Sequence, residues 1–234
     1  MFERSHHQRI EQVLRALNAA LLRDHACLFG GGTAIALTHG EYRESVDIDF
    51  LVSDIRHYRS LRLLLTGLDG VNSIVRPGAS PVMQTREVRA DQYGIRTTLQ
   101  VDGKPIKFEI VLEGRISLDA PSPGDAVCGI ATLSPLDMAA SKLLANSDRW
   151  GDDGVFNRDL MDLAMLKLPL GQLRQAVAKA EGAYGKSVLS DLAKAVHRVK
   201  TRHDWLERCM QVMAVNVPKA LLWKNIRALE RVLR

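Results

Sequence analysis

Residues 29–50 read FGGGTAIALTHGEYRESVDIDF, and this stretch decides the fold that we expect. Gly30, Gly31 and Gly32 stand between a short apolar segment, which predicts a strand, and TAIALT, which predicts the first turns of a helix. Glycines at such a junction let backbone N–H groups approach a ligand closely, and the helix N-terminus that follows favours an anion. The junction therefore indicates phosphate binding, although its spacing meets neither the Walker A nor the dinucleotide fingerprint.

The end of the same stretch carries paired carboxylates. Residues 46–52 alternate apolar and acidic side chains, which is the period of a strand, so Asp47 and Asp49 should share one face. Carboxylates this close repel each other unless a cation neutralises them, and their oxygens suit Mg²⁺. Glu109, in the apolar strand segment 105–112, supplies a third acid if the two strands are neighbours. Each acid alone would more often be a solvent-facing residue, but together they predict a two-metal site for phosphoryl transfer.

The rest of the chain changes from sheet to helix between residues 120 and 134. Helices are expected at 5–24 and 57–67, and strands at 81–90, 95–101 and 105–112, with Asp102–Gly103 as a tight turn. Further helices are expected at 135–146, 158–167, 170–182, 187–199 and 218–233. The fold class is therefore α+β, with a first domain over residues 1–130 and a helical C-terminal domain over residues 131–234.

Composition and charge are those of a globular protein and indicate no disulfide-rich, zinc-binding or membrane class. Hydrophobic residues make up 46% and charged residues 25%, which is ordinary for a globular protein. The net charge is +5, but residues 165–234 hold 14 Lys/Arg against 5 Asp/Glu, so this part could meet a polyanion or could simply present solvated helix faces. The three cysteines show neither a disulfide nor a zinc pattern. Without a signal peptide or a long apolar run, we expect a cytoplasmic protein that makes no membrane contact.

The motifs around the paired carboxylates resemble those of a known family. Gly-Gly-Thr followed by Arg43-x-Ser45-x-Asp47-Ile-Asp49 is similar to the first motif of the AbiEii/AbiGii nucleotidyltransferase toxins, a branch of the polymerase-beta-like superfamily. Downstream, the helical motif of that family is matched by residues Lys142, Arg149, Arg158, Asp159 and Asp162. The resemblance covers about residues 28–163. It implies a polymerase-beta-like nucleotidyltransferase domain, a small mixed sheet with helices, followed by a helical domain.

The resemblance also implies which residues bind the nucleotide. Gly31, Gly32 and Thr33 belong to the motif that would hold the triphosphate of an NTP. Arg43 would contact phosphate or the Asp pair, and Ser45 would cap the turn that enters the strand; both are counted with the nucleotide-binding residues.

A second group of residues would carry the reaction. Asp47, Asp49 and Glu109 would bind Mg²⁺, as two ions, and Glu109 would assist deprotonation of the attacking hydroxyl. Lys142 would neutralise triphosphate charge, and Asp159 would have a supporting or catalytic role. Without the resemblance, Lys142 would be read as a surface lysine and Asp159 as an ordinary helix-face acid.

The activity implied is that of a toxin from a bacterial two-gene toxin–antitoxin system, which transfers a nucleotide from an NTP to the 3′ end of tRNA. A cognate antitoxin would be its partner. Two alternatives stay open: another acceptor, either a protein hydroxyl (AMPylation) or an aminoglycoside, and a non-catalytic module that binds nucleotide or RNA. Trp150, Trp205 and Trp223 could stack bases, although such residues more often pack in a core. The basic run at 194–202 could bind an RNA backbone or be a solvated face.

Overall fold

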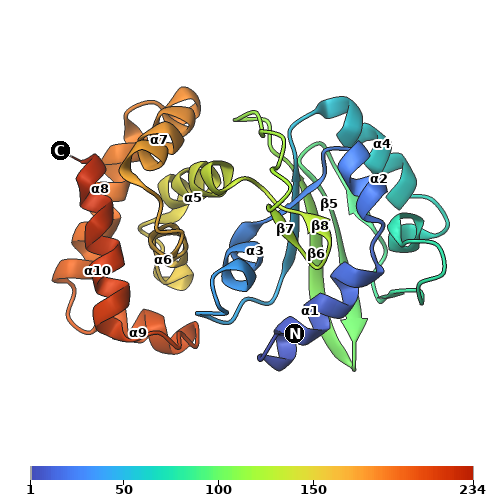
Figure 1. Ribbon diagram of the computed structural model, residues 1–234, viewed down its shortest axis with the longest axis horizontal. Helices are drawn as coiled ribbons and strands as arrows, with labels where there is room; N and C mark the ends of the chain where they lie inside the picture. Colours follow the sequence, from blue (N-terminus) through green and yellow to red (C-terminus); the bar gives the residue numbers. More distant parts are fainter. Residues whose placement is uncertain (1, 234) are drawn as a thin grey trace. The chain divides into compact units, whose positions relative to one another are not determined.

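A computed structural model describes residues 2–233 of the chain (Figure 1). Its internal contacts define two units: unit 1 is Met1–Thr38 with Ser45–Ser134, and unit 2 is His39–Glu44 with Pro135–Arg234. The α+β class expected from the sequence is confirmed. The domain boundary expected at residue 130 stays a prediction.

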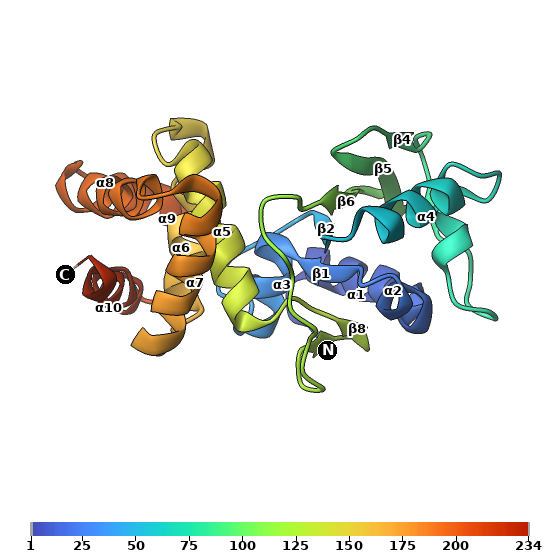
Figure 2. The same ribbon diagram turned by 90° about the horizontal axis from the view of Figure 1, so that it is seen from above.

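Unit 1 is built on a mixed sheet, whose strands follow one another in the order β1-β2-β6-β5-β3, with β4 beside β5 (Figure 2). The strands are β1 (Leu28–Gly30), β2 (Ile48–Val52), β3 (Met83–Gln84), β4 (Arg89–Ala90), β5 (Gly94–Val101) and β6 (Lys104–Leu112). β2 and β6 are parallel, and the other pairs are antiparallel. The hairpin expected at Asp102–Gly103 joins β5 to β6, and both residues have positive φ, 50° and 73°, as its tight turn requires.

The start of the paired-carboxylate strand differs from the expectation. β2 begins at Ile48, so Val46 and Asp47 precede it, and the Val46 side chain is 46% exposed rather than packed in the core. The alternation holds from Ile48 to Phe50, with Asp49 half-buried between two buried side chains, whereas Leu51 and Val52 are both buried. The rings of Phe29, Phe50 and Phe108 lie on three neighbouring strands with centroids 5.6 and 5.7 Å apart, and they form the core on one face of the sheet.

Helices cover the sheet of unit 1. They are α1 (Ser5–Ala16), α2 (Ala19–Asp24), α3 (Gly31–Thr38), α4 (Ile55–Leu65) and the 3₁₀ turn η1 (Gly70–Ile74), with a small second sheet of β7 (Ala126–Val127) and β8 (Ile130–Ala131). The single helix expected over 5–24 is wrong. It breaks because the backbone N–H of Asn18 donates to Ile74, at 2.8 Å, while the Asn18 side chain accepts from the N–H of Leu21 and caps α2.

Unit 2 is helical. Its elements are α5 (Pro135–Arg149), α6 (Arg158–Met165), α7 (Leu170–Tyr184), α8 (Ser187–Thr201), α9 (Trp205–Val212) and α10 (Lys219–Leu229), with 3₁₀ turns η2 (Asp153–Val155) and η3 (Glu230–Val232). α5 packs against α6, α7 and α8, and α10 packs against α6. The short helix α9 was not expected from the sequence. Across residues 2–233, none of the helices has both the length and the apolar character that crossing a membrane requires.

Candidate active site

Four residues line up across neighbouring strands of unit 1. Gly30 pairs with Asp49, Asp49 with Glu109, and Glu109 with Arg96. Residues that pair in this way project to the same face of a sheet, so the side chains of Asp49, Glu109 and Arg96 lie side by side. We call these three residues the charged row. The sequence predicted that Asp49 and Glu109 would be neighbours if their two strands were adjacent. The strands are adjacent, and the two acids lie side by side.

Gly31 brings the Asp49 carboxylate to the start of α3. Its φ is +68°, and a Cβ added there would lie 2.5 Å from Oδ2 of Asp49. Glycine alone combines this backbone conformation with so close an approach. The first N–H groups of a helix have no partner inside the helix and carry partial positive charge. The expected junction of strand, glycine and helix is therefore formed, and one of the predicted metal-binding acids lies at it. Its binding of an anion stays a prediction.

Thr33 and Ser45 hold the segment that leads into Asp47. The hydroxyl of Thr33, a residue only 1% exposed, donates to the Asp47 carbonyl at 2.5 Å and shares a hydrogen bond of 2.8 Å with the Ser45 hydroxyl. The Ser45 N–H donates to Nε2 of the fully buried His7 at 3.1 Å. No local pattern around His7 indicates this contact, because nothing in the sequence reveals that α1 lies against this segment. These contacts fix the backbone beside Asp47, whereas nucleotide contacts by Thr33 and Ser45 stay a prediction.

Two cations that the sequence did not single out hold Glu109. Arg96 donates through Nε to Oε1 of Glu109 at 2.5 Å, and Lys107 lies 2.7 Å from Oε2. Burial lowers the pKa of Lys107, but its hydrogen bond to Glu109 and the charges of Glu109, Asp49 and Asp47 outweigh burial and raise this pKa above its usual value. The Lys107 ammonium therefore lies in the combined field of all three predicted metal-binding carboxylates.

Mg²⁺ suits the chemistry of this donor set, since all three acids offer hard carboxylate oxygens and already attract a cation. In the part of the chain that the structure describes, however, no three acidic, histidine or cysteine side chains are arranged to hold a metal ion. Both oxygens of Glu109 are occupied by Arg96 and Lys107. A metal ion at Asp47, Asp49 and Glu109 would therefore share the Glu109 carboxylate with these two cations or displace them.

Unit 2 contains a buried group of charges, which we call the Lys142 cluster; its members are Arg43, Lys142, Arg149, Asp159 and Asp162. Lys142 Nζ lies 2.9 Å from Asp159 Oδ1 and 2.8 Å from Asp162 Oδ2. Arg149 donates two hydrogen bonds to Asp159, at 2.7 and 3.0 Å, and Arg43 donates two to Asp162, at 2.7 and 3.0 Å. Three cations thus surround two carboxylates, which leaves the cluster with one net positive charge.

The cluster keeps both aspartates ionised. Burial raises the pKa of Asp159, but the charge of Lys142 and the hydrogen bonds from Arg149 outweigh it and hold this pKa well below its usual range. Burial also opposes ionisation of Asp162, and the charges of Arg43 and Lys142 lower its pKa nonetheless. Reading Lys142 and Asp159 as surface residues is therefore wrong. Their roles toward nucleotide stay predictions.

Asp162 belongs to the matched family motif, but the sequence did not predict a role for it. It is fully buried and also accepts from the Tyr42 hydroxyl. Arg43 donates to Asp162, and its expected contact with phosphate or the Asp pair stays a prediction. A signal existed, because Asp159 and Asp162 stand three apart within an apolar helix run and so share one face of α6.

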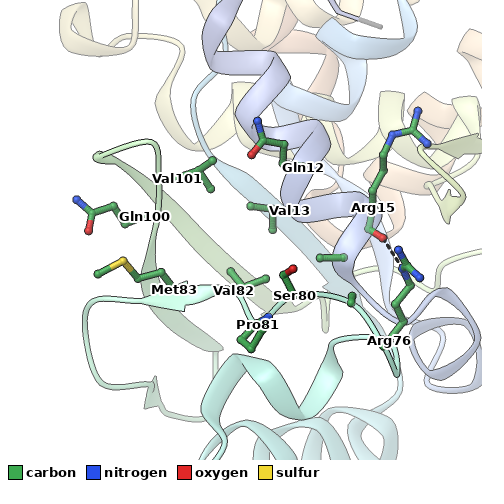
Figure 3. A pocket seen from close by; sticks show the side chains of 13 residues that line it. Gln12, Val13, Arg15, Arg76, Ser80, Pro81, Val82, Met83, Gln100 and Val101 are labelled. Atoms are coloured by element: carbon green, nitrogen blue, oxygen red, sulfur yellow. Dashed lines mark hydrogen bonds between the residues drawn. The ribbon is translucent and has the colours of Figure 1, made fainter.

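A cavity of about 510 Å³ lies elsewhere in unit 1, between α1, the segment of residues 76–83 and the end of β5 (Figure 3). Arg15 and Arg76 border it, and Nε of Arg76 donates to the Arg15 carbonyl at 2.9 Å. None of the predicted catalytic carboxylates lines this cavity.

Comparisons with known proteins agree with this geometry. The profile of the family described as "Nucleotidyl transferase AbiEii toxin, Type IV TA system" matches residues 12–226. Two Helicobacter pylori crystal structures share the fold. The candidate nucleotidyltransferase is 17% identical, with 97% of this chain and 94% of that chain covered at a TM-score of 0.52. JHP933 is 16% identical, with 100% and 95% covered at a TM-score of 0.55.

No curated protein matches the chain significantly in sequence. The family profile spans most of the chain, including both the charged row and the Lys142 cluster. The chain therefore belongs to the AbiEii family of nucleotidyltransferase toxins from type IV toxin–antitoxin systems, and it is an enzyme of nucleotidyl transfer.

Proposed function

We propose that this enzyme transfers a nucleoside monophosphate from an NTP to the 3′ end of an RNA, with tRNA as the expected acceptor and Mg²⁺ as the expected cofactor. The observation that carries the proposal is the placement of Asp49 and Glu109 in register on parallel strands, next to the N-terminus of α3. Carboxylates beside an anion-binding helix terminus suit a substrate that brings phosphates together with a divalent cation.

In the proposed reaction the 3′ hydroxyl oxygen of the RNA attacks the α-phosphorus. The new O–P bond forms while the bond from the α-phosphorus to the bridging oxygen of the β-phosphate breaks, and pyrophosphate leaves. Asp47, Asp49 and Glu109 would hold Mg²⁺, which when bound neutralises charge on the phosphate oxygens. Glu109 would accept the proton of the attacking hydroxyl, and the N–H groups of Gly31 and Gly32 would bind triphosphate oxygens.

Before substrate binds, Lys107 and Arg96 would pair with Glu109, as they do in the structure. They satisfy Glu109 in the structure, so the acid is not left as an uncompensated charge. If Glu109 bound a metal ion in place of these cations, Lys107 and Arg96 would be free to pair with the incoming phosphates. Lys142 and Asp159 keep the roles inferred from the resemblance, with Lys142 balancing triphosphate charge and Asp159 supporting it. A cognate antitoxin and a cytoplasmic location belong to the same proposal.

The test uses purified protein, each labelled NTP in turn and total bacterial tRNA, with and without Mg²⁺. We expect label on tRNA with the unmutated chain, loss of label with EDTA, and loss of label with Asp47→Ala. Asp69→Ala, which removes an exposed acid of unit 1, is the matched control and should transfer normally.

Other outcomes would replace the proposal. Label on protein would indicate AMPylation, and label on an aminoglycoside would indicate a drug-modifying enzyme. NTP binding without turnover on any acceptor would indicate a binding module. Equal transfer by Asp47→Ala and the unmutated chain would refute the assignment of the site.

A further inference from the structure

Trp150, the residue that follows α5, lines an open cleft of about 360 Å³ in unit 2. The other lining residues all come from α8: Ala193, Lys194, His197 and Arg198. Trp150 itself is half-buried, in contrast to Trp205, which is 2% exposed. Trp205 packs between Phe156, at 5.9 Å between ring centroids, and the guanidinium of Arg202, at 3.9 Å. Trp205 is therefore a core residue, whereas the Trp150 ring borders a space that a ligand can enter.

The cleft has an almost wholly apolar surface, and two of its five lining side chains, Lys194 and Arg198, end in cationic groups. The Lys194 ammonium lies 5.5 Å from the centroid of the Trp150 ring, which is cation–π distance. On α8, Lys194, His197 and Lys200 are exposed and recur at a spacing of three, so they follow one face of the helix. Asp191 pairs with Lys194, and Asp153 pairs with Arg198 and Arg202. Asp191 and Asp153 thus pair with three cations, and Lys200 adds a fourth positive side chain on α8.

Trp150 is held in place by a buried polar chain. Its backbone N–H donates to Asn146 at 2.7 Å, and its carbonyl accepts from Nδ2 of Asn157 at 3.0 Å. Asn157 is 3% exposed, and its Oδ1 accepts from Nε1 of Trp205 at 2.7 Å. The next carbonyl, that of Gly151, accepts from Arg198 at 2.8 Å, which ties the Trp150 loop to α8. A ring whose backbone is fixed in this way loses little freedom when a ligand stacks on it.

We propose that this cleft is a binding site for single-stranded RNA, in which one base stacks on Trp150 while the α8 side chains of Lys194, His197 and Lys200 contact the adjacent phosphates. A flat aromatic face beside a row of cations is the combination that single-stranded nucleic acid recognises, because every base offers a π face and every linkage offers an anion. This inference rests on the proposed function, since it assigns a place where the RNA acceptor is bound.

The test measures binding alone, without NTP or Mg²⁺, by the fluorescence anisotropy of a short fluorescein-labelled oligoadenylate. Trp150→Ala should weaken binding roughly 5- to 150-fold, the range that the loss of one stacked base produces. Trp150→Phe should restore most of the affinity. Lys200→Ala should weaken binding and reduce the slope of log K against log salt by about 1. Circular dichroism checks that each variant folds.

Matched controls lie on α10. Trp223→Ala removes another half-buried tryptophan, and Lys224→Ala removes another exposed lysine. Neither should change binding. The inference is overturned if Trp150→Ala binds as tightly as the unmutated chain or loses no more affinity than Trp223→Ala. It is overturned equally if an RNA duplex competes better than the single strand, or if only an acidic peptide binds at the cleft.

Binding and transfer can fail separately. Asp47→Ala should bind the oligonucleotide normally, because the carboxylates take no part in the cleft. Trp150-dependent binding without transfer to any RNA would refute the proposed function and leave this inference intact. Transfer to RNA with an unchanged KM for the RNA in Trp150→Ala would refute this inference and leave the proposed function intact.

Discussion

Replacing Asp162 with alanine tests the central claim about the Lys142 cluster. The substitution removes the acceptor of two hydrogen bonds from Arg43, one from Lys142 and one from the Tyr42 hydroxyl. The side chains of Arg43 and Lys142 are only 6% and 8% exposed, so water cannot replace the lost carboxylate. Removing one partner of a buried ion pair typically costs about 3–5 kcal/mol, and a domain has about 5–15 kcal/mol in total. Asp162→Ala should therefore remove roughly a fifth or more of the stability.

Urea unfolding, followed by circular dichroism, measures this loss as a lower midpoint. Asp162→Asn keeps the shape and one acceptor, so it provides a milder variant if the alanine protein does not fold. Asp191→Ala, which breaks the surface pair with Lys194, is the control and should cost at most about 1 kcal/mol. The reasoning is refuted if Asp162→Ala shifts the midpoint no more than Asp191→Ala does.

Three further predictions concern Gly31, His7 and the pH dependence of the Lys142 cluster. Gly31→Ala should lose about 1–2 kcal/mol of stability, because its φ is +68°. It should also lose transfer activity on the order of 100-fold, because the new Cβ displaces Asp49; Gly171→Ala, with nothing within 4 Å of the added atom, should do neither. His7→Leu leaves the Ser45 N–H without its acceptor, so the free energy of unfolding should fall by about 1–3 kcal/mol. The variant's kcat should fall by a larger factor than its KM changes. His7→Gln should recover part of the stability and part of kcat. Finally, the two aspartates of the Lys142 cluster have lowered pKa values, so the stability that they contribute is complete above a pH of about 4 and is lost as pH falls toward their folded pKa values. A stability profile that stays flat as the solution is acidified below about pH 4 would contradict this last prediction.

The sequence predicted those parts of the site that depend on local pattern. Alternation along β2 places Asp49 and Phe50 on opposite faces of the sheet. The Asp102–Gly103 turn fixes the β5–β6 hairpin, and the glycine run starts a helix. Each of these signals is read within a few residues, so it survives without knowledge of the tertiary fold. The family resemblance added Lys142 and Asp159, which the pattern alone would have left as surface residues.

The parts that were missed depend on contacts between distant segments. Arg96 and Lys107 become partners of Glu109 only through the register of β5 and through alternation along β6. The break at Asn18 needs the Ile74 carbonyl, which lies more than fifty residues away in sequence. Asp162 gains its importance only when the segment that carries Arg43 reaches α6. No local propensity contains this information.

The charged row limits how the length of this protein can change. Because side chains alternate along a strand, one residue inserted into β6 just before Glu109 would turn the acid toward the phenylalanine core and bring an apolar side chain to the site. The same holds for a deletion inside β2 ahead of Asp49. The loops at 76–81 and 114–125 carry no strand pairing and can lengthen or shorten without this effect. Point substitutions and length changes should therefore be tolerated at different places. In a scan of single-residue deletions, activity should be lost for deletions within β2 and β6.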